Sequence, residues 1–107
     1  RRFARFERAL SVSWPGCDTP AVTTEVGRGG CLLRGALPAP AHGHFALHLP
    51  ETGRTLHVEA DVTHRLGDLA PGPSAGDGLR FCRFDEGDEP AWIEYLAGLE
   101  QRSRADT

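Results

Sequence analysis

The sequence predicts an all-β domain with a C-terminal helix, built as a small six-stranded antiparallel barrel. Two observations lead to this prediction. Apolar and polar residues alternate through six short segments as far as Phe84, which is the period of half-buried strands. Beyond Asp88 the apolar residues recur at helical spacing instead. A chain of 107 residues can bury one modest core, so we expect a single domain over residues 1–107.

Turn residues separate the expected strands, which cover residues 10–14, 21–26, 31–33, 45–49, 56–62 and 79–84. Pro15-Gly16 ends the first strand, a glycine turn joins the second to the third, and residues 51–54 predict a hairpin turn. We expect a Pro-rich connection over residues 37–43. The glycines and prolines of residues 67–78 predict a mobile loop before the last strand.

The expected helix begins near Pro90. Proline suits the first helical turn, and Asp88 and Glu89 place negative charge at the positive end of the helix dipole. One apolar stripe follows, made of Trp92, Ile93, Leu96 and Leu99. We therefore expect this helix to cover the open end or the side of the barrel.

Composition excludes several classes of function. Hydrophobic residues make up 39% and charged residues 25%, which is ordinary for a soluble globular protein. No apolar run approaches the roughly 20 residues of a membrane span, and no leader peptide is recognisable, so we expect a cytoplasmic protein without membrane insertion. A net charge of −3 argues against DNA or RNA as partners. The chain begins with arginine and contains no methionine, so we expect it to be part of a longer chain.

The cysteines and the other nucleophiles predict no catalysis. Cys17, Cys31 and Cys82 are widely separated and form neither a disulfide framework nor a zinc motif. We expect them to act as small apolar residues in a reducing compartment. No serine or cysteine has identifiable catalytic partners, so we expect no enzyme activity, no catalytic residues and no cofactor.

One metal site remains an alternative on the polar faces of two neighbouring expected strands. His44 and His48 share a face of one strand, and His57, Glu59 and Asp61 share the polar face of the next. A cross-strand metal site is geometrically possible there. An ordinary polar sheet face has the same pattern, however, and no close histidine or cysteine spacing supports a metal, so we predict none.

Two segments about twenty residues apart carry the candidate binding chemistry. The first is Arg1-Arg2-Phe3-Ala4-Arg5, and the second is the glycine-rich stretch of residues 24–30. Guanidinium groups beside exposed backbone amides suit a small anionic ligand such as a phosphate. Because the arginines of residues 1–8 repel one another, we expect this arm to be mobile without an anion. The alternatives are a solvated basic arm and a turn that merely needs positive φ.

In order and spacing, these segments resemble the PilZ family, whose domains receive cyclic di-GMP through an R-x-x-x-R motif followed by [D/N]-x-S-x-x-G. Arg1 to Arg5 matches the first motif. The second motif is Glu25-Val26-Gly27-Arg28-Gly29-Gly30, with glutamate at the Asp/Asn position and glycine at the Ser position. The resemblance runs along nearly the whole chain, including Gly78-Leu79-Arg80-Phe81 before the helix.

The resemblance implies a PilZ-like barrel that binds cyclic di-GMP and relays it to a protein partner or an adjacent domain. The binding residues that it implies are Arg1, Arg2, Arg5, Glu25, Gly27, Arg28 and Gly30. The alternative is a degenerate PilZ-like domain that does not bind the nucleotide. Such a domain would act as a protein–protein adaptor in the regulation of motility or surface polysaccharide.

Overall fold

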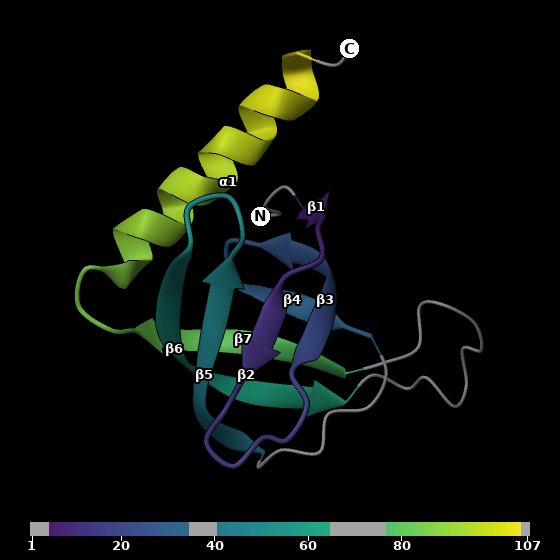
Figure 1. Ribbon diagram of the computed structural model, residues 1–107, viewed down its shortest axis with the longest axis vertical. Coiled ribbons are helices and arrows are strands. Elements are labelled where there is room, and N and C mark those ends of the chain that lie inside the picture. The colour runs from purple at the N-terminus through teal and green to yellow at the C-terminus, as the bar shows by residue number, and fades with distance from the viewer. Residues whose placement is uncertain (1–4, 35–40, 65–76, 106–107) are drawn as a thin grey trace.

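The computed structural model describes residues 5–34, 41–64 and 77–105 (Figure 1). These residues form seven strands and one helix, all within a single sheet-and-helix unit. The strands are β1 (Arg5–Glu7), β2 (Ser11–Ser13), β3 (Ala21–Gly27), β4 (Gly30–Leu33), β5 (His42–Leu49), β6 (Arg54–His64) and β7 (Asp77–Phe84). The helix is α1 (Asp88–Ala105).

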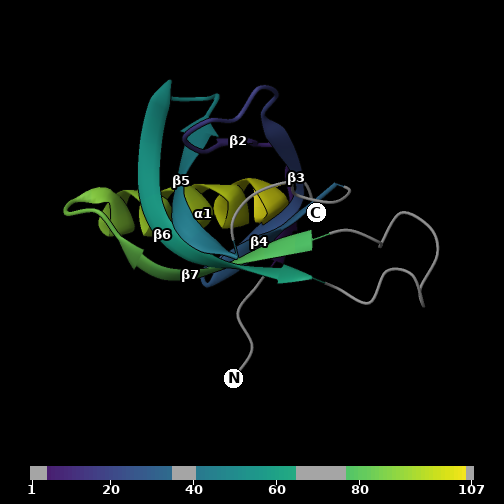
Figure 2. The same ribbon diagram turned by 90° about the horizontal axis from the view of Figure 1, so that it is seen from below.

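The sheet closes on itself. Its strand order is β1-β3-β2-β5-β6-β7-β4, every pairing is antiparallel, and β4 also pairs with β3. The result is a closed six-stranded barrel, with β1 as an extra short strand on β3, which removes the free edges that an open sheet would leave. Figure 2 shows the strands curving around the interior, with α1 lying across one end. The predicted fold class is confirmed.

Alternation along the strands fills the barrel with side chains. Leu56, Val58, Ala60 and Val62 of β6 are all buried, as the period-two pattern predicts. The helix adds Trp92, which has no exposed surface, and its ring lies 5.7 Å from that of Phe81. Trp92 therefore closes the end of the barrel that α1 covers.

The strand limits differ from the expected ones where local pattern is weak. The first expected strand is shorter, only Ser11–Ser13, and it is preceded by the unpredicted β1. β5 begins at His42, inside the expected Pro-rich connection, and β7 begins at Asp77. Most of that connection, and residues 67–76 of the expected mobile loop, lie outside the described residues.

The helix agrees closely with its predicted pattern. It begins at Asp88, and Trp92, Leu96 and Leu99 are buried while Ile93 is half-buried. In Figure 1 its C-terminal turns extend beyond the strands. Among the residues described, no helix combines the length and the apolar character needed to cross a membrane.

Candidate functional site

The pairing of β1 with β3 brings the two predicted binding segments together. In this antiparallel register Arg5 lies opposite Gly27, and Phe6 lies opposite Val26. Phe6 is partly buried and packs against the core, which directs Arg5 outward on the other face of the strand. The last arginine of the first motif therefore stands beside the glycine turn of the second.

Arg5 contacts the motif glutamate directly. Its Nη1 lies 3.6 Å from Glu25 Oε1, and the two side chains are 63% and 40% exposed. The residues are diagonal neighbours on one face of the β1–β3 pair, which is the separation that long side chains can span. An exposed pair of this kind is held weakly, so a ligand can displace Glu25 from the guanidinium at small cost.

The turn does not need positive φ, which was the alternative explanation of its glycines. The glycines with positive φ in the described part of the chain are Gly16, Gly53 and Gly87, none of them in the turn. That alternative is wrong. Gly30 has another structural reason: a Cβ there would collide with the carbonyl oxygen of Leu79 on β7.

The turn is fixed from two sides. The amide of Phe81 donates a hydrogen bond to the carbonyl of Gly29 at 2.9 Å, which ties the turn to β7. The indole Nε1 of Trp92 donates to the carbonyl of Gly27 at 3.0 Å, which ties it to the helix. Gly27, which occupies the serine position of the motif, is buried beneath the side chain of Trp92. The site is therefore a preformed backbone platform rather than a loose loop.

The N-terminal arm is held by pairing and contacts over residues 5–8. β1 is paired with β3, and the amide of Arg8 donates to the carbonyl of Thr24 at 3.2 Å. The Arg8 guanidinium forms an ion pair with Glu51, and its Nε donates to the hydroxyl of Tyr95 at 3.1 Å. These contacts argue against a free arm over residues 5–8, while mobility in the absence of an anion stays a prediction. Arg1 and Arg2 lie outside the described residues.

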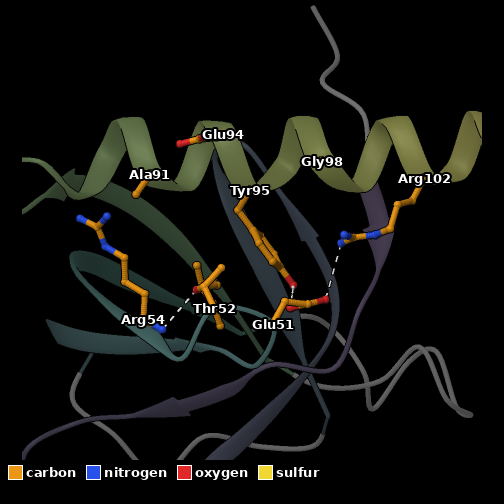
Figure 3. Close-up of a pocket in the computed structure, with 9 residues that line it drawn as sticks. Glu51, Thr52, Arg54, Ala91, Glu94, Tyr95, Gly98 and Arg102 are labelled. Atoms are coloured by element: carbon orange, nitrogen blue, oxygen red, sulfur yellow. Dashed lines mark hydrogen bonds and ion pairs between the residues drawn. The ribbon is translucent and has the colours of Figure 1, made fainter.

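A cavity of about 340 Å³ lies elsewhere, between the β5–β6 turn and α1 (Figure 3). It is lined by Leu49, Glu51, Thr52, Arg54, Ala91, Glu94, Tyr95, Gly98 and Arg102. In Figure 3 Tyr95 and Arg102 both reach from the helix to Glu51, at 3.1 Å and 3.6 Å. Of the predicted binding residues that the structure describes, none lines this cavity. Arg5 and Arg28 are exposed, and Glu25 is half-buried.

A polar cluster that the sequence analysis did not assemble lies on the outer face of β5, β6 and β7. His42 contacts Asp61 through Nδ1 and Glu59 through Nε2, the latter at 2.6 Å. The hydrogen bonds to Asp61 and then to Glu59 raise the pKa of His42 above its ordinary value. Glu59 and Asp61 were on the predicted polar face. His42 was missed because β5 begins within the expected Pro-rich connection.

Of the comparisons with known proteins, the one with solved structures found a similar architecture. No family model matches the chain, and no curated protein matches it. The structure of the Bacillus subtilis inhibitor of motility, MotI/DgrA, superposes with a TM-score of 0.71 at 18% sequence identity.

The superposition covers 97% of this chain. The fold of this chain is PilZ-like. This chain spans about half the length of the motility inhibitor, because the superposition covers 53% of the inhibitor's chain. At this low identity the likeness concerns the barrel and helix alone.

Proposed function

We propose that this PilZ-like domain binds cyclic di-GMP beside the β3–β4 turn and relays the signal to a partner protein or a neighbouring domain. The observation that carries the proposal is the β1–β3 register, which sets Arg5 opposite Gly27 and so joins the two motif segments. Arg5 would supply the planar, paired donors that a phosphate or a guanine edge requires. Arg28, exposed at the turn, would add a second guanidinium.

The two departures from the motif set the expected strength. A missing serine hydroxyl at Gly27 removes one hydrogen bond to a charged group, worth roughly 1.5–3 kcal/mol. Glu25 keeps a carboxylate but holds it one methylene further out, at a cost of about 1 kcal/mol in ordering. Together these amount to roughly 30- to 1000-fold in affinity. We therefore expect binding weaker than that of a domain with the complete motif.

The runner-up function is an adaptor that no longer binds the nucleotide. Two contacts favour it. Glu25 already pairs with Arg5, and the carbonyl of the buried Gly27 is already bound by Trp92. A site whose groups satisfy one another can persist as a structural element. The domain would then act through protein–protein contacts, in motility or surface-polysaccharide regulation.

Calorimetric titration with cyclic di-GMP tests the proposal. Arg5→Ala should weaken binding at least tenfold, because it removes a charge-assisted hydrogen bond. Arg34→Ala is the matched control, since Arg34 follows the other end of β4 from the turn. Equal affinity in the parent and in Arg5→Ala would remove the site from this surface.

The same titration separates the two functions when the motif is restored. Glu25→Asp with Gly27→Ser should tighten binding, or create it where the parent shows none, because the φ of residue 27 is not positive. Circular dichroism checks that the double variant keeps its fold. Absence of binding in both the parent and the folded double variant would favour the adaptor.

A further inference from the structure

Three adjacent strands each bring one metal-ligating side chain to the same point of the outer sheet face. His42 comes from β5, Asp61 from β6 and Cys82 from β7, and one ligand atom of each lies within 4.8 Å of the other two. His42 lies directly opposite Asp61 in the β5–β6 register. In the β6–β7 pair the register shifts between Glu59 and Ala60 of β6. Cys82 is therefore the extra residue of a β-bulge in β7.

The bulge explains why the thiol reaches the cluster. Arg80 pairs with Asp61 and Phe81 with Ala60, but the next pair is Arg83 with Glu59, which leaves Cys82 without a partner residue in the ladder. Bulges bend the strand and re-aim side chains. Cys82 is exposed on the same face as Asp61. Desolvation raises the pKa of its thiol, and the Asp61 carboxylate raises it further.

The imidazole of His42 lies between two carboxylates. Both ring nitrogens face carboxylate oxygens, Nδ1 toward Asp61 Oδ1 and Nε2 toward Glu59 Oε2. A neutral imidazole has only one N–H to donate, so two such contacts require either a second proton or a metal ion on the ring.

We propose that His42, Asp61 and Cys82 form a binding site for a borderline-soft divalent metal ion, Zn²⁺ foremost, with water as the fourth ligand. Imidazole, carboxylate and thiolate together are a ligand set that zinc accepts in tetrahedral geometry. Tetrahedral zinc places its ligand atoms roughly 3.3–3.8 Å apart. Ligand atoms within 4.8 Å lie near these separations, and rotation of the His42 and Asp61 side chains would part Nδ1 from Oδ1 to admit the ion.

Neighbouring side chains already orient these three ligands. Glu59 accepts from Nε2 of His42, which is the carboxylate–histidine arrangement that fixes the tautomer of a metal-bound histidine. Arg80 donates to Oδ2 of Asp61 at 2.6 Å and leaves Oδ1 facing His42. Arg83 holds Glu59 in turn, at 3.6 Å. The bound ion would join β5, β6 and β7 across the barrel wall.

Titration of the reduced protein with Zn²⁺ and with Co²⁺ tests the site. We expect one ion per chain, a rise in melting temperature with Zn²⁺, and a thiolate-to-cobalt charge-transfer band in the near ultraviolet. Cys82→Ser should abolish that band and weaken Zn²⁺ binding at least tenfold. Glu59→Gln should weaken it about 10- to 100-fold while keeping the band.

Cys17→Ser is the matched control, because Cys17 is a half-buried thiol outside the cluster. It should change neither the band nor the affinity. His42→Gln supplies an independent loss that does not depend on the thiol. The inference is overturned if the parent binds no Zn²⁺ at submillimolar concentration, if Co²⁺ gives no charge-transfer band, or if affinity is the same in Cys82→Ser and His42→Gln as in the parent. All four positions have solvent-accessible side chains, and circular dichroism verifies that each variant folds.

Discussion

At Gly30 the chain passes beneath the carbonyl of Leu79 with no room for a side chain. The residue also ends the motif that predicts nucleotide binding, so one glycine has two possible reasons to be there. The contact shows that the packing reason is sufficient. Gly29, its neighbour in the same turn, has nothing within 4 Å of where a Cβ would stand. The two glycines therefore form a natural comparison.

Gly30→Ala should lower the free energy of unfolding by about 1–3 kcal/mol, because the methyl group must push β4 away from β7. Gly29→Ala should change it by less than about 0.5 kcal/mol. Urea denaturation followed by tryptophan fluorescence measures both. Equal stability of the two variants would mean that β4 and β7 separate without cost.

Burial separates the three thiols. Cys31 lies in the core, where desolvation raises the pKa of its thiol to about 12, and the hydrogen bond to the Leu79 backbone lowers it only in part. Cys17 is half-buried and Cys82 is exposed. Because thiolates are the reactive form, a disulfide reagent should modify Cys17 and Cys82 in the folded protein and Cys31 only after unfolding. Rapid loss of all three thiols under native conditions would contradict this burial.

At the scale of elements, α1 is joined to the β3–β4 turn through Trp92. Trp92 fills the end of the barrel, stacks near Tyr95 with 5.8 Å between ring centroids, and donates to Gly27. The helix pattern was predictable because Trp92, Leu96 and Leu99 recur at helical spacing. The hydrogen bond to Gly27 was not, since it joins residues from opposite ends of the chain.

Trp92→Phe should destabilise the protein by about 2–4 kcal/mol. About 1–3 kcal/mol would come from the lost hydrogen bond to the buried Gly27 carbonyl, and the rest from the smaller ring. Tyr95→Phe is the control: it keeps the aromatic contact and loses only the hydroxyl that bridges Arg8 and Glu51, for about 1 kcal/mol. A smaller loss in Trp92→Phe than in Tyr95→Phe, by chemical denaturation, would show that the helix is not fixed through the indole.

For the whole molecule, the pairing of β1 makes residues 5–7 part of the sheet. The amide of Arg8 should therefore exchange slowly with solvent in the absence of cyclic di-GMP, since it is bonded to the Thr24 carbonyl. Hydrogen exchange with and without the nucleotide measures this. Fast exchange of that amide in the free protein, slowed by the nucleotide, would restore the picture of an arm that the ligand orders.

The barrel was predictable because alternation is strong in its longer strands, above all in β6, where four apolar residues line one face. β1 was missed because its three residues include only one apolar side chain, Phe6, and lie among arginines. The pairing of Arg5 with Gly27 and the meeting of His42, Asp61 and Cys82 depend on registers between distant strands and on a bulge. A local pattern carries no information about register, so these junctions required the structure.

The closure of the sheet through β4 and β7 also has a consequence for how the chain folds. β5 and β6 meet across a four-residue turn, whereas Gly30 must pair with Arg80 across about half of the chain. Loop-closure entropy opposes pairings between residues far apart in the chain. The β5–β6 hairpin should therefore form early, and the β4–β7 pairing should form late in folding. Contacts that form after the folding transition state affect the unfolding rate much more than the folding rate. A substitution at Gly30 that disturbs the β4–β7 contact would thus raise the unfolding rate. It would leave the folding rate nearly unchanged.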